Sequence, residues 1–180
     1  MRIVSGKYRG RKLVPPANLP VRPTTDYAKE SLFNILVNWV DYETLEVLDL
    51  FSGTGSIAFE FASRGARSVM AVDANPRCIE FIRKSATEFG ITEIEAVRTN
   101  AFVFLKHMKA KYDLIFADPP YDLKDLDRIP DLVVESGLLK PEGLLILEHP
   151  ASYDWSEHAT FSRHRNYGKV NFTFFEQPNG

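Results

Sequence analysis

The stretch Val47-Leu48-Asp49-Leu50-Phe51-Ser52-Gly53-Thr54-Gly55 decides how this chain folds, because a short apolar run ends there in a glycine-rich turn. Such a run predicts a buried strand, and glycine allows the positive φ angles that a tight strand-to-helix turn requires. From Leu45 onward, similar runs alternate with amphipathic segments. This alternation predicts a parallel sheet with helices on both faces.

The elements expected from the sequence define an α/β fold. Short apolar runs predict strands at 45–50, 68–72, 94–98, 112–117 and 143–148. Amphipathic segments between them predict helices at 56–64, 76–89, 101–109 and 125–136. Thr24 or Thr25 can cap an earlier helix that runs to about Val40. Residues 158–165 and 168–176 predict a terminal hairpin that turns around Tyr167-Gly168.

These elements predict a mostly parallel, seven-stranded sheet that ends in an antiparallel hairpin. This doubly wound, Rossmann-like arrangement is the one expected of class I S-adenosylmethionine-dependent methyltransferases, although a fold alone does not establish chemistry. Residues 2–14 alternate loosely around Gly6 and Gly10, as a short hairpin does.

Composition limits the class of protein. With 180 residues, of which 44% are hydrophobic and 26% charged, the chain is expected to form one soluble globular domain. It has no apolar run of membrane-spanning length and no signal peptide, so we expect a cytoplasmic protein. We also expect a monomer. A single cysteine, Cys78, excludes an internal disulfide, and the spacing of cysteines and histidines predicts no metal site.

Charge is unevenly distributed along the chain. The net charge is −2, yet six basic residues and no acidic residue precede Asp26, which leaves 16 basic and 24 acidic residues from there onward. The early basic residues are Arg2, Lys7, Arg9, Arg11, Lys12 and Arg22. We therefore divide the chain into a basic extension, 1–23, and a catalytic domain, 24–180. The extension is either a solvated tail or an arm that contacts phosphates.

The glycine turn marks one end of a predicted cofactor site. In an open parallel sheet, ligands bind beyond the carboxyl ends of the strands, where Gly53 and Gly55 are expected. Asp73 ends the next strand, and its carboxylate can accept hydrogen bonds from both hydroxyls of a ribose. Asp49 lies before the glycines and suits the cationic amino acid part of S-adenosylmethionine.

Other interpretations of this turn remain open. Residues 53–58 also fit the G-x-G-x-x-A pattern of dinucleotide-binding proteins, and an ordinary strand-to-helix turn would look similar. Asp49 and the lack of room for a second substrate domain favour S-adenosylmethionine. Asn100 can contact the adenine or simply cap the helix that starts at Ala101. The predicted cofactor site comprises Asp49, Phe51, Gly53, Gly55, Asp73, Asn100 and Ala101.

The run Asp118-Pro119-Pro120-Tyr121 follows the fourth predicted strand and marks a reaction site. An exocyclic amine on a base is a poor nucleophile, because its lone pair is delocalised into the ring. The Asp118 carboxylate and the Pro119 carbonyl can accept its N–H groups, and consecutive prolines hold such acceptors in place. Tyr121 offers a face for stacking the base. Taken alone, the same four residues would also suit a plain loop.

Further blocks of sequence resemble one family. Residues 2–13 (RIVSGKYRGRKL), 22–26 (RPTTD), 30–34 (ESLFN), 49–55 (DLFSGTG) and 63–66 (SRGA) are similar to the bacterial 16S rRNA (guanine-N2)-methyltransferase family, called RsmD. The resemblance spans nearly the whole chain. It implies methyl transfer from S-adenosylmethionine to N2 of one guanine in 16S rRNA, within an assembled or partly assembled small subunit.

The resemblance also assigns residues and shows departures. It implies a target-amine site at Asp118–Tyr121, and rRNA contacts are expected from Lys7, Arg9, Arg11, Lys12 and Arg22. Lys29 stands where the family generally has arginine, Tyr121 replaces a phenylalanine, and the terminal hairpin is less typical. Because a paired base cannot reach such a pocket, we expect an unpaired or flipped guanine.

Competing functions remain. A DNA adenine-N6 or protein glutamine methyltransferase would use the same site, but it usually carries a target-recognition region for which this chain has no room. A non-catalytic RNA-binding module could keep the fold, yet Asp118, Gly53, Gly55 and Asp73 are all present. A small dinucleotide oxidoreductase has no evident hydride-transfer residue to support it.

Overall fold

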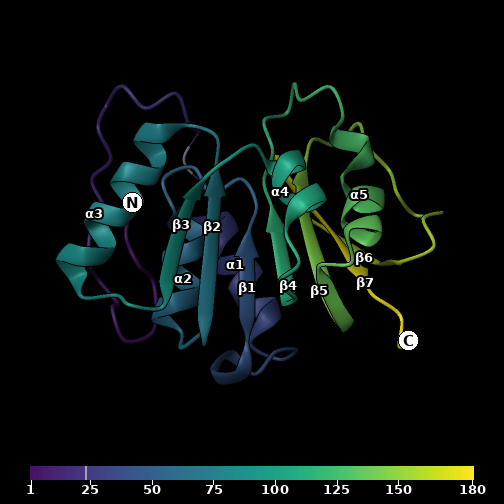
Figure 1. The fold of residues 1–180 in the computed structure, drawn as a ribbon, viewed down its shortest axis with the longest axis horizontal. Helices are drawn as coiled ribbons and strands as arrows, with labels where there is room; N and C mark the ends of the chain where they lie inside the picture. The colour runs from purple at the N-terminus through teal and green to yellow at the C-terminus, as the bar shows by residue number, and fades with distance from the viewer. Residues whose placement is uncertain (23) are drawn as a thin grey trace.

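The computed structural model describes residues 1–22 and 24–180, and it contains a seven-stranded sheet in the order β3-β2-β1-β4-β5-β7-β6 (Figure 1). The strands are β1 (Glu46–Asp49), β2 (Ser68–Asp73), β3 (Ile94–Arg98), β4 (Tyr112–Ala117), β5 (Leu139–His149), β6 (Phe161–Tyr167) and β7 (Val170–Glu176). The first five pair in parallel, whereas β7 runs antiparallel to both β5 and β6. The predicted sheet with its terminal antiparallel hairpin is therefore confirmed.

Helices cover both faces of the sheet. They are α1 (Asp26–Leu36), α2 (Ser56–Ser63), α3 (Pro76–Phe89), α4 (Ala101–His107) and α5 (Ile129–Ser136), with short 3₁₀ helices η1 (Tyr42–Thr44) and η2 (Leu126–Arg128). In Figure 1, α4 and α5 lie in front of the sheet, and α1 and α2 lie behind it. None of the helices in the described part of the chain combines the length and apolar character needed to cross a bilayer.

Alternating strand residues supply two separate cores. In β1, Val47 packs in the core shared with α1, α2 and α3, while Leu48 packs in the core shared with α4 and α5. In β4, Phe116 packs in the core shared with α1, α2 and α3, and Ile115 packs in the core shared with α4 and α5. Since successive side chains of a strand point to opposite faces, a strand buried on both sides becomes the continuous apolar run seen in the sequence.

Several predicted boundaries shift in the structure. Helix α1 ends at Leu36 rather than near Val40, because the amide of Trp39 bonds to the carbonyl of Leu36 in a tighter turn. Strand β5 begins at Leu139 rather than 143, and its register against β4 shifts near a positive-φ residue, Glu142. The last helix is expected to begin at residue 125, but Leu126–Arg128 form the 3₁₀ helix η2 and α5 begins only at Ile129.

The N-terminal segment forms the expected hairpin. Arg2 and Lys12 make an antiparallel bridge, and the amide of Ile3 donates to the carbonyl of Arg11 at 3.0 Å. Ile3, Tyr8 and Leu13 of this hairpin (residues 1–13) are buried in the core shared with α1 and α2. The predicted domain boundary at residue 23 lies outside the described residues.

Candidate active site

One cavity of about 560 Å³ opens at the carboxyl ends of the parallel strands. It brings together residues that follow β1, β2, β3 and β4 and one residue near the end of β5, as expected for an open parallel sheet. Ten of the predicted site residues line it, namely Asp49, Phe51, Gly53, Asp73, Asn100, Ala101 and the run Asp118–Tyr121. Arg22 lines it as well, whereas Gly55 and the other four predicted arm residues are not among its lining residues.

In the glycine turn after β1, Gly53 and Gly55 have different structural roles. Gly53 has a φ of +52° and faces the cavity, and its amide donates to Oδ2 of Asp73 at 2.8 Å. Gly55 has a φ of +81°, and a Cβ there would lie 2.9 Å from Cγ1 of Ile82. Gly53 thus leaves room for a ligand, while Gly55 allows α2 to pack closely against α3.

Asp73 is held by backbone groups. Its second oxygen, Oδ1, accepts the amide of Asn75 at 2.8 Å. Each carboxylate oxygen can accept more than one hydrogen bond, so both oxygens keep acceptor capacity toward the cavity. This geometry suits a pair of ribose hydroxyls.

Asp49 is a buried carboxylate without a partner. It is 1% exposed, and neither of its oxygens accepts a hydrogen bond from any residue that the structure describes. Burial, together with the charge of Asp73, raises the pKa of Asp49 to about 8, and the backbone amide of Ala58 opposes that shift only in part. Such a group is costly unless a cation pairs with it, and an amino acid ammonium has the required charge. The orphaned carboxylate therefore fits the amino acid end of S-adenosylmethionine.

Asn100 acts as a helix cap. Its side-chain oxygen accepts the amides of Phe102 at 2.9 Å and Val103 at 3.3 Å, which satisfies the first turn of α4. Of the two roles left open by the sequence, capping is confirmed. Since Asn100 also lines the cavity, its NH2 group can still reach a bound base.

The reaction end of the cavity holds a carboxylate that the sequence prediction missed. Glu148, near the end of β5, is 5% exposed, and its Oε1 accepts the Tyr121 hydroxyl at 3.1 Å. Its Oε2 has no hydrogen-bond partner among the described residues. An acidic residue near the end of an apolar strand run was the available signal, because the carboxyl ends of parallel strands gather at one edge.

The acidic groups interact electrostatically. Burial raises the pKa of Asp118 well above its ordinary value, and the charges of Glu148 and Asp49 raise it further. Burial likewise raises the pKa of Glu148, while the Tyr121 hydroxyl and Arg22 oppose that shift. Arg22 places its guanidinium 5.3 Å from the centre of the Tyr121 ring. It is the one predicted arm residue that contributes a cation to this cavity.

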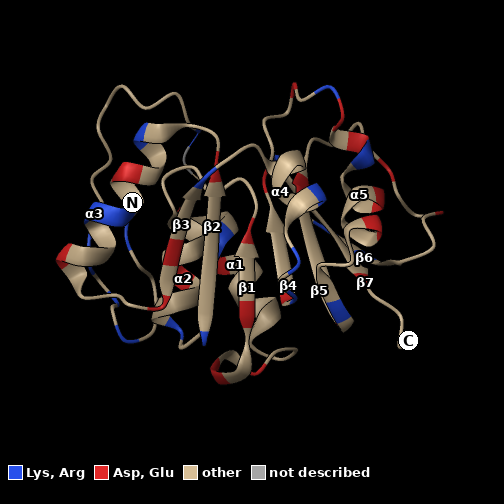
Figure 2. Cartoon of the chain, in the orientation of Figure 1, with Lys and Arg blue, Asp and Glu red and all other residues tan. Residues whose placement is uncertain are grey.

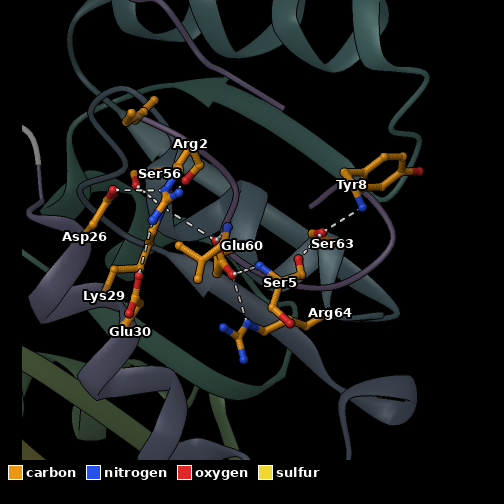
Figure 3. A network of polar contacts seen from close by, with 12 residues as sticks. Arg2, Ser5, Tyr8, Asp26, Lys29, Glu30, Ser56, Glu60, Ser63 and Arg64 are labelled. Carbon is orange, nitrogen blue, oxygen red and sulfur yellow. Dashed lines mark hydrogen bonds and ion pairs between the residues drawn. The ribbon is translucent and has the colours of Figure 1, made fainter. Parts of the chain in front are cut away.

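The hairpin is fixed to the domain by a buried polar network (Figure 3). Glu60 of α2 is fully buried and accepts the amides of Val4 at 2.9 Å and Ser5 at 3.0 Å. Lys29 of α1, 1% exposed, lies 3.5 Å from Glu60 and donates to the Arg2 carbonyl at 2.6 Å. The network therefore joins α1, α2 and the hairpin.

The remaining predicted arm residues are exposed on this hairpin, beside α3 (Figures 1 and 2). Arg11 stacks over the ring of Phe89 at 5.0 Å, and Lys7 lies 5.0 Å from the ring centre of Tyr8. Arg9 and Lys12 are exposed on the same hairpin. These four cations form a surface separate from Arg22.

Comparison with known proteins identifies the family. A family model described as Conserved hypothetical protein 95 matches residues 1–176. The chain belongs to the RsmD family. Ribosomal RNA small subunit methyltransferase D of Buchnera aphidicola is 32% identical over 151 residues, which cover 82% of this chain and 75% of that protein. The protein of the same name from Escherichia coli is 28% identical, covering 98% and 90% of the two chains.

Solved structures share the fold of this RsmD-family protein. The Escherichia coli protein yhhF superposes with a TM-score of 0.88 and 28% identity, covering 100% of this chain and 99% of the other. An RNA methyltransferase from Salinibacter ruber, solved in complex with S-adenosyl-L-homocysteine, gives a TM-score of 0.69 at 16% identity, covering 88% and 95%. The predicted class I methyltransferase fold is thus confirmed.

Proposed function

We propose that this protein uses S-adenosylmethionine to methylate the exocyclic N2 amine of one guanine in the rRNA of the small ribosomal subunit. One observation carries the proposal. A cofactor half, with Asp49 and Asp73, and an amine-binding half, with Asp118 and Tyr121, meet in one cavity. Membership in the RsmD family supports the rRNA substrate.

At the cofactor half, each residue has a distinct task. Asp49 pairs with the ammonium, Asp73 accepts the ribose hydroxyls, and the α4 start at Asn100 and Ala101 bounds the adenine together with Phe51. S-adenosylmethionine supplies an electrophilic methyl group on a sulfonium sulfur. Asp49 and Asp73 would hold the two ends of the cofactor in the cavity that Asp118 also lines, and positioning of this kind accounts for much of the rate of a displacement.

At the other half, the chain prepares the nucleophile. Asp118 and the carbonyl of Pro119 accept the N–H groups of guanine N2, which localises the nitrogen lone pair, and Tyr121 stacks on the ring. Nitrogen forms the new bond to the methyl carbon as the carbon–sulfur bond breaks, and one proton leaves N2. Asp118, with its raised pKa, is suited to take that proton once it is ionised, and Arg22 favours the ionised form.

The substrate must present an unpaired base. Flipping a guanine out of a helix costs a few kcal/mol, so an exposed loop nucleotide is favoured. Flanking phosphates of 16S rRNA, in a small subunit or an assembly intermediate, are held by basic side chains of the N-terminal segment. These are Lys7, Arg9, Arg11, Lys12 and Arg22. The protein acts as a cytoplasmic monomer, with residues 1–23 as its RNA-binding extension.

The test uses small subunits from cells that lack the endogenous methyltransferase. They are incubated with radiolabelled S-adenosylmethionine and either the wild type or Asp118→Ala, and the rRNA is digested to nucleosides. Label in N2-methylguanosine, absent with Asp118→Ala, is expected. Label in another nucleoside would overturn the guanine assignment, and transfer to DNA adenine instead would favour the N6 alternative. No transfer, with cofactor binding intact, would overturn the proposal.

A further inference from the structure

One aromatic side chain of α1 is exposed at the edge that carries the cavity. Tyr27 is 65% exposed, although large aromatic side chains are usually well buried. Its ring meets that of Tyr167 edge to face, with centroids 6.3 Å apart and an interplanar angle of 83°. Thr25 and Val170, close to these tyrosines in the sequence, both line the cavity. The tyrosine pair therefore continues the cavity wall outward.

The direction of β7 explains this placement. Because β7 runs antiparallel to β5, with Asn171 paired to His149, the turn between β6 and β7 lies at the carboxyl end of β5. Helix α1 begins at the same edge, since Thr25 caps it and lines the cavity. Residues distant in the sequence thus meet beside the reaction end of the cavity.

The terminal hairpin is basic within an acidic body. From Phe161 to Glu176 it carries three cations, Arg163, Arg165 and Lys169, and one acidic residue, Glu176, which ends β7 far from the cavity. None of these three cations forms an ion pair with a carboxylate among the residues that the structure describes. Arg163 instead covers the ring of Trp39 of the segment after α1, with 3.7 Å between guanidinium and ring centre.

Protection of an edge strand explains only part of this pattern. Charges on β6 discourage pairing with another sheet, but either sign of charge would do so. Cations of one sign interleaved with aromatic rings match the needs of single-stranded nucleic acid, whose bases stack while its phosphates require counter-charges.

We propose that Tyr27, Tyr167, Arg163, Arg165 and Lys169, the α1–β6 strip, bind an unpaired nucleotide that neighbours the target guanine. Its base stacks on Tyr27, supported edge-on by Tyr167, and its phosphates lie against Arg165 and Lys169. This inference rests on the proposed function. It adds an RNA contact on α1 and β6, distinct from the exposed cations Lys7, Arg9, Arg11 and Lys12 of the N-terminal hairpin.

Loss of the stacking ring and loss of the cations should weaken RNA binding in different ways. Loss of one base–aromatic stack weakens binding by about 1–3 kcal/mol, and the strong exposure of Tyr27 places it at the low end, so Tyr27→Ala should weaken RNA binding about 5- to 10-fold. Tyr27→Phe keeps the ring and should bind like the wild type. The double variant Arg165→Gln/Lys169→Gln should lower the salt dependence of binding by roughly one to two units of slope.

Two readouts test the strip in the full-length protein. The first is the KM and kcat for small subunits at saturating S-adenosylmethionine. The second is the affinity for a fluorescent single-stranded RNA 12-mer at several salt concentrations. Val103→Ala, another exposed side chain but on α4, is the matched control. Thermal melting and cofactor binding should be unchanged in every variant, because the substituted side chains are exposed or at an edge.

The expected result is a 5- to 10-fold higher KM and weaker 12-mer binding for Tyr27→Ala, with kcat retained, and wild-type behaviour for Tyr27→Phe and Val103→Ala. Unchanged KM and 12-mer affinity in Tyr27→Ala and the double variant would overturn the inference while leaving the proposed function intact. A raised KM with unchanged 12-mer affinity would assign the strip to a ribosomal protein and overturn the RNA contact. If the wild type transfers no methyl group, the 12-mer titration alone decides.

Discussion

If Asp49 pairs with the ammonium of the cofactor, as proposed, its raised pKa makes cofactor binding dependent on pH. In the folded protein without cofactor, its pKa is about 8, whereas an unperturbed aspartate has a pKa of about 3.9. Because the ammonium of the cofactor pairs with the ionised form, binding below pH 8 must release the proton that Asp49 holds. The dissociation constant should therefore fall as pH rises from pH 6 toward pH 8, by up to about tenfold per pH unit, and rise again where the α-ammonium of the cofactor loses its own proton.

The same shift changes stability. Between pH 4 and pH 8 the folded state binds more protons at Asp49 than the unfolded state does, so the free energy of unfolding falls as pH rises through this window. The raised pKa corresponds to a cost on the order of 5 kcal/mol for ionising Asp49 in the folded protein. Asp49→Asn escapes this cost, so it should stabilise the protein without cofactor at pH 8 and above, while its gain shrinks toward pH 5.

Calorimetry with S-adenosylhomocysteine measures the binding effect, because this ligand keeps the amino acid group without the reactive methyl. Titrations at pH 6.5 in buffers of different ionisation enthalpy should show release of nearly one proton, and titrations above pH 9 should show none from Asp49. Asp122→Asn, an exposed site outside the cavity lining, is the control and should keep the pH slope. A flat dissociation constant from pH 6 to pH 8, or unimpaired binding by Asp49→Asn, would refute the reasoning.

Four further substitutions test the scaffold and the reaction end. Glu60→Ala leaves Lys29 buried without its anion and should lower the free energy of unfolding by about 3–5 kcal/mol in urea titrations, whereas Lys29→Met should cost less because Glu60 keeps other donors. Gly55→Ala forces a positive φ and a close contact on a residue with a Cβ, so thermal melts should show a loss on the order of 2 kcal/mol. Tyr121→Phe keeps the stacking ring but removes the bond to Glu148, so kcat should fall less than tenfold, and a larger loss would mean that the hydroxyl takes part in the chemistry.

The sequence carries most of the fold because local patterns determine it. The apolar run before Gly53 and the one before Asp118 are each buried on both faces, and their short length, bounded by glycine or proline, identifies β1 and β4. Boundaries were harder to predict. Strand β5 continues through Glu142 in a positive-φ conformation that such a residue rarely adopts, and no sequence rule marks it as part of a strand.

The site was predictable only where its residues lie close to turn signals. The run Asp118–Tyr121 and the glycine turn can each be recognised from a few consecutive residues. Glu148 does not, because its contact with Tyr121 spans 27 residues and depends on the pairing of β4 with β5. The attachment of the N-terminal hairpin is even harder to predict from the sequence, because Glu60 accepts hydrogen bonds from the amides of Val4 and Ser5, more than 50 residues away. Tertiary pairing of polar groups has no periodic signature.

The position of β7 sets the order in which the protein can be completed during synthesis. Strand β7 lies between β5 and β6, yet it is translated after both of them. Until it leaves the ribosome, β6 has no neighbour in the sheet, and the backbone N–H and C=O groups along one edge of β5 are unpaired. A nascent chain in this state offers an unpaired strand edge, which is prone to aggregation. We therefore expect the native sheet to close only after Glu176 has emerged, and chaperone contact during translation to concentrate on β5.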